Sequence, residues 1–247
     1  MLTGKTALVT GGAKGIGRSI ALKIAQAHGN VAIMYRGSQK NAEQTIDELQ
    51  ALGIQAKSYQ CDVADFNATK ELVTQVIKDF GGLDILVNNA GINKDQLMIR
   101  ISDDEWYQLI HTNLDSAFYC SRAVLRPMMK KRYGRIINIS SVVGMNGNAG
   151  QAHYAAAKSG LLGFTFSLAQ EYGNRGITAN VVAPGFIQSD MTAALSPEQS
   201  AKIQAGIAVG RLGNPEDVAA VAAFLASPRA GYISGQVIKV DGGMSSL

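Results

Sequence analysis

Short runs of β-branched residues alternate with longer segments of helical periodicity along the whole of this 247-residue chain. This alternation is the pattern of repeated strand-helix-strand units, in which each helix crosses back over a parallel sheet. No Pro/Ser-rich linker, internal repeat or low-complexity tract interrupts it, so we predict one α/β domain over residues 1–247 with seven strands and helices on both faces. The predicted strands are 5–10, 30–35, 55–61, 83–88, 134–140, 177–183 and 235–240, and the predicted helices are 16–28, 39–52, 65–80, 103–130 (continuous or with one break), 152–172, 197–206 and 215–226.

Three helix ends carry signals of their own. The stretch SDDE at 102–105 is a capping box, and Gly29 follows the first predicted helix. Asn214 and Pro215 offer an N-cap followed by proline at the first helical position. These signals support the helix boundaries independently of the hydrophobic pattern.

The composition indicates a globular protein and excludes several classes of function. Hydrophobic residues make up 47% and charged residues 17% of the chain, and no apolar run reaches the roughly 18 to 20 residues of a membrane span. The opening MLTGKTALVT lacks the features of a signal peptide, so we expect a cytoplasmic protein. Cys61 and Cys120 lack metal-ligand spacing and are expected to be buried free thiols, and no metal site is predicted. A net charge of +4 is too small for a nucleic-acid-binding protein but suits an anionic small molecule or an acidic partner.

In an open parallel sheet, ligands bind outside the carboxyl ends of the strands, and the first predicted strand ends in TGGAKGIG at residues 10–17. Gly11, Gly15 and Gly17 would let the chain turn sharply and let a pyrophosphate approach the backbone at the start of a helix. The spacing is G-x-x-x-G-x-G and not the usual dinucleotide fingerprint G-x-G-x-x-G. The loop is therefore either a phosphate-binding turn or only a tight connection.

The second predicted strand ends at Tyr35 and Arg36, without the carboxylate that usually binds the free 2′-hydroxyl of an adenine ribose. Arg36, Ser38 and Lys14 would instead suit a 2′-phosphate, which favours NADP over NAD. The alternative is that Arg36 is an ordinary solvated charge. After the third strand, Asp62 either accepts a bond from the adenine amino group or caps the next helix.

Polar side chains also follow the fourth and fifth predicted strands. Asn88 and Asn89 would tie neighbouring loops together, while Ala90 and Gly91 would leave room for a flat ligand; a purely structural role is the alternative. Ser140 and Ser141 follow the fifth strand and place a hydroxyl at the same edge of the sheet.

Tyr154 and Lys158 lie four residues apart, separated by three alanines, on a predicted helix. Residues i and i+4 share a helix face, so the ammonium would lie near the phenol and favour its ionised form. A tyrosine tuned in this way acts as a general acid or base near neutral pH. For an isolated Y-x-x-x-K, a half-buried tyrosine beside a solvated lysine is the more common arrangement.

Taken together, these stretches resemble the short-chain dehydrogenase/reductase family over essentially the whole chain. TGGAKGIG is similar to the family's T-G-x-x-x-G-x-G cofactor loop, and NNAG at 88–91 to its N-N-A-G motif. Ser141 and the pair Tyr154 and Lys158 match its catalytic serine and Y-x-x-x-K. Asn113 falls at the family's fourth catalytic position, although HTN replaces the commoner V-N before it, a departure that concerns local packing.

The resemblance implies a Rossmann-type doubly wound fold, an NADP cofactor, and Asn113, Ser141, Tyr154 and Lys158 as catalytic residues. The implied cofactor contacts are Gly11, Lys14, Gly15, Ile16, Gly17, Arg36, Ser38, Asp62, Val63, Asn89, Ala90, Gly91, Tyr154, Lys158, Pro184, Gly185 and Ile187. The implied substrate contacts are Ser141, Tyr154 and Gln151, with a surface glutamine as the alternative for Gln151. Residues 186–206 look like the mobile segment that closes over the substrate in this family.

Within the family, GNAGQAHYAAAKSGLLGF and GQVIKVDGGM are among the stretches similar to the branch that reduces 3-oxoacyl groups on acyl carrier protein in type II fatty acid synthesis. This implies an NADPH-dependent reduction to a 3-hydroxyacyl thioester, in which Ser141 hydrogen-bonds the keto oxygen and Tyr154 delivers the proton. Lys158 would lower the pKa of Tyr154 and hold the nicotinamide-ribose hydroxyls. Asn113 would anchor a water that connects Lys158 to solvent.

The partner expected from this resemblance is an acidic acyl carrier protein. The basic stretch RPMMKKRYGR at 126–135, followed by Arg175, would steer it and place its pantetheine arm at the cleft, with Arg132 and Arg175 as contacts; a solvated basic face is the alternative. The family usually forms dimers or tetramers through helices near 103–130 and 152–172, so a homotetramer is expected.

Two other functions stay open from the sequence. One is an NADP-dependent reductase of a coenzyme A thioester, a sugar or another ketone. The other is a cofactor-binding regulator without catalysis, which the intact catalytic set disfavours.

Overall fold

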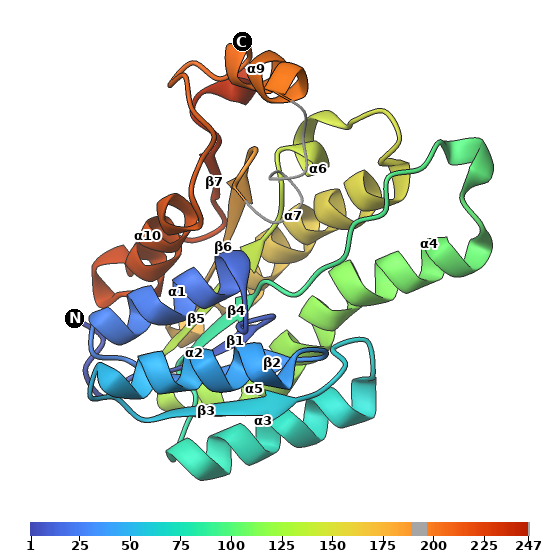
Figure 1. Ribbon diagram of the computed structural model, residues 1–247. Coiled ribbons are helices and arrows are strands. Elements are labelled where there is room, and N and C mark those ends of the chain that lie inside the picture. Colours follow the sequence, from blue (N-terminus) through green and yellow to red (C-terminus); the bar gives the residue numbers. More distant parts are fainter. Residues whose placement is uncertain (189–196, 247) are drawn as a thin grey trace.

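Seven strands form one parallel sheet in the computed structural model, which describes residues 1–188 and 197–246 (Figure 1). The order across the sheet is β3-β2-β1-β4-β5-β6-β7, so the chain starts in the middle and moves first to one edge and then to the other. All seven strands match the predicted positions. Their bounds are β1 (Thr6–Thr10), β2 (Asn30–Tyr35), β3 (Ala56–Gln60), β4 (Ile85–Asn88), β5 (Gly134–Ile139), β6 (Ile177–Pro184) and β7 (Val237–Val240).

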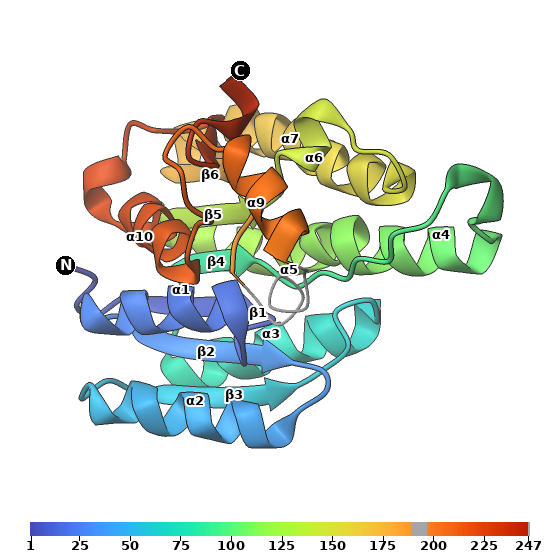
Figure 2. The ribbon, with the colours of Figure 1, turned by 45° about the horizontal axis from the view of Figure 1, so that its top comes forward.

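Helices cover both faces of the sheet (Figures 1 and 2). The main helices are α1 (Gly15–Gln26), α2 (Gln39–Ala51), α3 (Phe66–Phe80), α4 (Asp103–Ile110), α5 (Ser116–Lys131), α6 (Val143–Asn146), α7 (Ala152–Tyr172), α9 (Pro197–Ala205) and α10 (Pro215–Ala226). Short 3₁₀ turns, marked η, occupy η1 (Met98–Arg100), η3 (Gly173–Arg175), η4 (Pro228–Ala230) and η5 (Met244–Ser246), and η2 (His111–Asp115) is a π-helical turn.

The core consists of two apolar layers, one on each face of the sheet. Alternate residues of β1 point to opposite faces: Val9 packs in the layer with α1, α2 and α10, and Leu8 in the layer with α3, α5 and α7. The central strands are buried on both faces, which is why they are continuously apolar in sequence. The doubly wound arrangement predicted from the sequence is therefore confirmed.

The predicted helix 103–130 does contain a break, and the break lies at a candidate site residue. The chain runs as α4 to Ile110, makes the π turn over His111–Asp115, and continues as α5. An extra residue in a helical turn rotates the side chains that follow it, and such turns are frequent at functional sites. Asn113 lies in the middle of this turn and is buried.

Two of the three predicted helix-end signals act as expected. Ser102 and Glu105 form the capping box at the start of α4, and the Asp217 carboxylate accepts a bond from the Asn214 N–H before Pro215 at the start of α10. At the end of α1, however, the left-handed residue is His28 (φ 64°) and not Gly29. A Cβ at Gly29 would lie 2.9 Å from Ile24 Cγ2, so this glycine allows close packing instead. The short helix α6 was not predicted, because four residues are too few to show a helical period.

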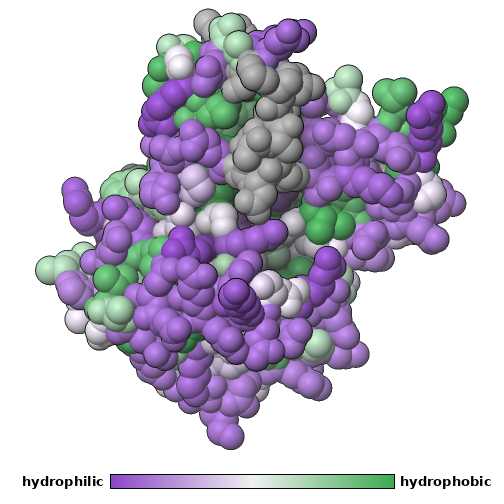
Figure 3. Space-filling model, viewed as in Figure 1, coloured by the Kyte–Doolittle hydropathy of each residue, from purple (hydrophilic) through white to green (hydrophobic). Residues whose placement is uncertain are grey.

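The surface view in Figure 3 is mainly hydrophilic, and exposed apolar residues gather at the tip of the arm between β4 and α4, where Leu97, Met98 and Ile99 are exposed. Within the described part of the chain, no helix is both long enough and apolar enough to cross a membrane.

Candidate active site

The carboxyl ends of β1 and β4 are joined by side-chain hydrogen bonds at the centre of the sheet. The Thr10 hydroxyl accepts bonds from the backbone N–H groups of Asn89 and Ala90, both at 2.9 Å. The Asn89 amide donates to the carbonyls of Thr10 at 2.9 Å and Gly11 at 3.4 Å. The NNAG segment therefore holds the glycine loop in place, as the amide-rich pattern predicted. Thr10 has a central part in this arrangement that the sequence analysis missed, although it opens the quoted motif.

The glycine loop has the backbone conformation that its sequence predicted. Gly11 and Gly15 have φ values of +65° and +54°, which strongly favour glycine. A Cβ at Gly17 would lie 2.3 Å from the Gly11 carbonyl oxygen, so any larger residue would displace backbone. By contrast, a Cβ at Gly15 would meet nothing within 4 Å, so open space lies over the loop. Lys14 is exposed beside this space, and Ile16, in the first turn of α1, is partly exposed.

The ends of β2 and β3 bring Arg36 and Asp62 together. The Arg36 guanidinium lies 3.6 Å from an Asp62 carboxylate oxygen, and both side chains are about half exposed. Ser38 caps α2 by accepting the Asn41 N–H at 3.2 Å. Asp62 does not cap α3: it accepts a bond from the Ala64 N–H, and Asp65 is the cap. The helix-cap alternative for Asp62 was therefore wrong, because the helix begins three residues later than that cap requires.

A chain of amides connects β4 to α7 beneath the site. The Asn88 amide donates to Asn138 Oδ1 at 2.8 Å and to Ser121 Oγ at 3.3 Å. Asn138 donates in turn to Thr165 Oγ1 at 2.8 Å. Asn138 was not singled out from the sequence, although a polar residue within the buried run GRIINIS was a usable signal. These buried hydrogen bonds link β4, β5, α5 and α7 to one another. The Asn88 amide oxygen has no hydrogen-bond partner among the described residues.

The candidate catalytic residues converge at the end of β5. Ser141 follows that strand, and its hydroxyl is close enough to Tyr154 on α7 to lower the pKa of that phenol. The Ser141 hydroxyl also accepts the Val143 N–H at 3.2 Å. The Lys158 ammonium lies 5.7 Å from the Tyr154 ring centre. Two further bonds hold α7 against the end of β5: the Lys158 ammonium donates to the Ile139 carbonyl at 2.9 Å, and the Ser140 hydroxyl donates to the Lys158 carbonyl at 2.8 Å.

Asn113 joins this group from the π turn. Its amide makes two bonds with the backbone of Ile92, accepting the N–H at 2.7 Å and donating to the carbonyl at 2.8 Å. A Cβ added to Gly91 would lie 3.1 Å from Asn113 Oδ1 and 3.5 Å from the Lys158 nitrogen. Gly91, Asn113 and Lys158 are therefore close neighbours, and this position leaves little room for any residue larger than glycine.

Burial dominates the protonation of the Tyr154 and Lys158 pair. It raises the pKa of Tyr154; the hydrogen bond from Ser141 opposes this, and the charge of Asp95 adds to it. The direction is opposite to the one predicted from the spacing of the pair, because burial disfavours the charged phenolate and is the largest cause of the change. Burial also lowers the pKa of Lys158 to about 8. Tyr154 is therefore a protonated phenol near neutral pH.

The loop after β6 lies at the same edge of the sheet. Pro184 ends β6 and accepts a bond from the Val142 N–H at 3.0 Å, while the Gly185 N–H donates to the Val240 carbonyl at 3.0 Å. Ile187 is buried and pairs with Gly213. The segment 186–206, predicted to close over the substrate, is only partly described, because residues 189–196 lie outside the described residues.

The Gln151 side chain is occupied by protein partners. Its amide nitrogen donates to Asp95 at 2.6 Å, and its amide oxygen accepts a bond from Asn148 at 3.0 Å. Asp95 and Asn148 were not predicted, since both lie in loops without a recognisable pattern.

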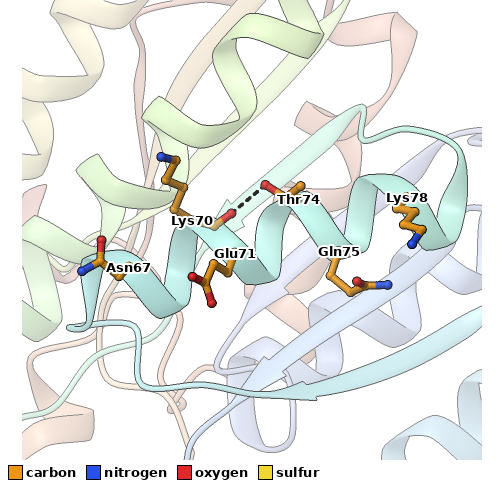
Figure 4. Close-up of a pocket in the computed structure, with 6 residues that line it drawn as sticks. All are labelled: Asn67, Lys70, Glu71, Thr74, Gln75 and Lys78. Carbon is orange, nitrogen blue, oxygen red and sulfur yellow. Dashed lines mark hydrogen bonds between the residues drawn. The ribbon is translucent and has the colours of Figure 1, made fainter.

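A depression lies on the outer surface of α3, away from these residues (Figure 4). It has a volume of about 270 Å³ and is lined by polar and charged residues of that one helix: Asn67, Lys70, Glu71, Thr74, Gln75 and Lys78. It contains none of the candidate site residues, and its hydroxyl is bonded within the helix, from Thr74 to the Lys70 carbonyl at 2.9 Å. We assign no chemistry to it.

The known proteins that this chain resembles are reductases and dehydrogenases, in agreement with the geometry of the site. A family model described as "Enoyl-(Acyl carrier protein) reductase" matches residues 11–245. The chain is 49% identical over 240 residues to the 3-oxoacyl-[acyl-carrier-protein] reductase FabG of Staphylococcus aureus, covering 97% of this chain and 98% of that one. It is 52% identical over 241 residues to the protein of the same name from Salmonella typhimurium, covering 98% and 97%.

Solved structures agree with the fold. A short-chain alcohol dehydrogenase candidate from Sinorhizobium meliloti superposes with a TM-score of 0.95 at 36% identity, covering 99% of this chain and 98% of that one. A gluconate dehydrogenase candidate from Agrobacterium tumefaciens gives the same TM-score and identity, covering 100% and 98%.

Proposed function

This chain belongs to the short-chain dehydrogenase/reductase family, and we propose that it reduces 3-oxoacyl-[acyl-carrier-protein] to the 3-hydroxyacyl form in type II fatty acid synthesis. The observation that carries the proposal is the convergence of Ser141, Tyr154 and Lys158 at the end of β5, in a chain about half identical to reductases named for this reaction. The family model's description names enoyl reduction instead. The relatives match nearly the full length of this chain, and their shared name specifies the 3-oxoacyl substrate. They therefore favour 3-oxo reduction.

The cofactor we propose is NADP. Open space over Gly15, the positive φ of Gly11 and Gly15, and the exposed Lys14 fit a pyrophosphate at the start of α1. Arg36 and the α2 cap Ser38 suit a 2′-phosphate, and Asp62 and Val63 would lie against the adenine. Asn89, Ala90, Gly91, Pro184, Gly185 and Ile187 would line the rest of the dinucleotide site. When bound, NADPH supplies the hydride.

Replacement of Arg36 with alanine is expected to raise the KM for NADPH about 10-fold and to leave that for NADH nearly unchanged, because only the 2′-phosphate loses a charged partner. Initial rates with both cofactors measure this. Lys40→Ala, which removes another exposed cation near the start of α2, is the matched control. An equal loss with both cofactors would contradict this assignment of Arg36.

Each of the candidate catalytic side chains would have its own role in the reduction. Ser141 would donate a hydrogen bond to the keto oxygen and stabilise the negative charge that develops there. Tyr154, protonated near neutral pH because its pKa is raised, would deliver the proton to that oxygen. Lys158 would hold the ribose hydroxyls and pass a proton back to Tyr154, and Asn113 would anchor the water that supplies it. Gln151 would contact the substrate through the second N–H of its amide, with its bond to Asp95 kept.

We propose that a second copy of the chain completes the carrier-protein site. Arg132 and Arg175 lie together, since the Arg132 guanidinium donates to the Asn174 carbonyl at 2.9 Å. They precede β5 and β6, however, whereas Ser141 follows β5, so the length of a six-residue strand, about 20 Å, separates them. The expectation that this patch places the pantetheine arm at the cleft stays a prediction. We propose that it serves the cleft of a neighbouring copy in a cytoplasmic homotetramer.

Charge reversal at this patch, in Arg132→Glu or Arg175→Glu, is expected to raise the KM for a carrier-bound 3-oxoacyl substrate about 10-fold or more, because an acidic partner would be repelled. The KM for the N-acetylcysteamine thioester should not change, since that substrate lacks the carrier. Lys70→Glu on the outer face of α3 is the control for net charge. Equal losses with both substrates would contradict the docking role.

The test of the function itself is NADPH oxidation against 3-oxoacyl-carrier, 3-oxoacyl-coenzyme A, 2-enoyl thioesters, simple ketones and sugars, with NADH as a control. The proposal requires the carrier-bound 3-oxo substrate to have the highest kcat/KM. A preference for coenzyme A thioesters, ketones or sugars would favour a related reductase, and cofactor binding without turnover of any of them would favour a regulator. We also propose that residues 1–247 act as one domain, because a single sheet supplies every part of this site.

A further inference from the structure

A carboxylate with no part in the mechanism above is bonded to the residue that precedes the helix of the catalytic tyrosine. Asp95 belongs to the loop between β4 and η1, on the arm that projects from the molecule in Figure 1. One of its carboxylate oxygens accepts two bonds, from the Gln151 amide at 2.6 Å and from the Asn93 amide at 2.7 Å. A single acceptor atom thus joins its own loop to the segment before α7.

This contact fixes the start of the helix that carries Tyr154. Gln151 immediately precedes α7, and its carbonyl accepts the Ala155 N–H at 2.7 Å. Beside it, the Gln96 N–H donates to the Gly150 carbonyl at 2.7 Å, a second link between the same two segments. Tyr154 follows Gln151 by three residues, in the first turn of α7. The position of the phenol therefore depends on where the arm holds this turn.

Asp95 also acts on the phenol by its charge, which adds to the effect of burial in raising the Tyr154 pKa. Among the described residues, the Ser141 hydroxyl opposes this effect, and the Lys158 ammonium lies 5.7 Å from the ring centre. His153, next to Tyr154 on α7, is buried. On the arm and α4, Lys94 and Gln96 both contact Glu105, so the charges of Lys94 and Glu105 largely offset each other.

We propose that Asp95 is a positioning residue for the reduction: it holds the first turn of α7 through Gln151 and places a negative charge near the Tyr154 phenol. The proposal rests on the function proposed above. A negative charge near the phenol keeps the proton on it, which suits a group that must donate a proton to the keto oxygen. It also favours reduction over the reverse oxidation at neutral pH, since oxidation needs the phenolate.

Two substitutions separate the two effects. Asp95→Asn removes the charge and keeps an amide oxygen that can accept the Gln151 bond, whereas Asp95→Ala removes both. For Asp95→Asn we expect kcat at pH 7 to stay within about threefold of wild type. In the pH–rate profiles, we expect the falling limb of reduction and the rising limb of oxidation both to move to lower pH by several tenths of a unit. The shift should shrink in 1 M salt, because Asp95 is exposed. For Asp95→Ala we expect the same shift together with a roughly 10-fold lower kcat.

The control is Asp104→Asn, which removes an exposed carboxylate at the start of α4 and should leave both limbs in place. A second readout does not depend on turnover. Ionisation of tyrosines is followed by ultraviolet absorbance, and subtracting the titration of Tyr154→Phe from that of wild type leaves the signal of the Tyr154 phenol alone. The same subtraction is made between Asp95→Asn and the double variant that also carries Tyr154→Phe. A phenol that titrates at lower pH in Asp95→Asn supports the inference even if no 3-oxoacyl thioester is reduced. Superimposable titrations and pH limbs would overturn it, whatever happens to kcat.

Discussion

Replacing Tyr154 with phenylalanine is expected to lower kcat for ketone reduction by about 1000-fold, because general acid catalysis typically contributes a factor of about 10² to 10⁴. Phenylalanine keeps the ring in the first turn of α7 and removes only the phenol hydroxyl. The fold and the glycine loop do not depend on that hydroxyl. Steady-state NADPH oxidation with a 3-oxoacyl thioester measures the effect.

The matched measurement is NADPH binding by fluorescence, which should change by less than about threefold in the same variant, since the pyrophosphate and 2′-phosphate contacts proposed above remain. Tyr107→Phe, which removes an exposed hydroxyl from α4, should leave both kcat and binding unchanged. Retention of more than a tenth of the wild-type kcat in Tyr154→Phe would show that another group supplies the proton.

Replacing Lys158 with methionine is expected to have two opposite effects: loss of most reductase activity, and a gain in stability at pH 7. The ammonium is buried and donates a hydrogen bond to one carbonyl, that of Ile139. Burial lowers its pKa from the ordinary 10.5 to about 8, which corresponds to a penalty of about 3 kcal/mol while the group is charged. Methionine fills a similar volume without a charge, so we expect the free energy of unfolding of the cofactor-free protein to rise by about 1–3 kcal/mol.

The pH dependence of this gain follows from the direction of the pKa change. Because the folded-state pKa of Lys158 lies below its unfolded value, the unfolded chain binds more protons between about pH 8 and 10.5. The penalty is therefore complete below pH 8 and is relieved as the pH rises through this window. The stability difference between Lys158→Met and wild type should be largest at pH 7 and much smaller at pH 10.

Urea unfolding of both proteins at pH 7 and pH 10, without cofactor, measures this difference. Lys70→Met on the exposed face of α3 is the control for removal of a lysine charge and should differ little from wild type at either pH. A Lys158→Met variant less stable than wild type at pH 7 would mean that the ammonium is stabilised by more than its one bond to Ile139. A difference that does not depend on pH would contradict the assignment of the penalty to ionisation.

The glycine loop and the catalytic residues are features that could be predicted from the sequence. The left-handed turns at Gly11 and Gly15 and the crowding at Gly17 follow from local backbone sterics, so a motif of eight residues was enough to predict them. The positions of Ser141, Tyr154 and Lys158 were also predictable, because parallel strands bring their carboxyl ends to one edge and a helical spacing of four shares one face.

Other parts of the site depend on contacts between distant segments. Asp95 and Gln151 are 56 residues apart and meet only because two loops leave neighbouring strands at the same edge. Asn113 reaches Ile92 because a π turn interrupts the helix, which the apolar pattern indicated only as one of two alternatives. Arg132 and Arg175 form a basic patch, as predicted, but at the amino edge of the sheet, because each precedes its strand.

The sequence by itself therefore determined the order of strands and helices, the conformation of the glycine loop and the identity of the residues at the sheet edge, since each of these follows from periodicity and local sterics. Only the tertiary structure decided the direction in which the pKa of Tyr154 changes. Spacing along a helix reveals the neighbouring lysine, but it does not reveal burial, which depends on everything packed around the phenol and raises the pKa of Tyr154.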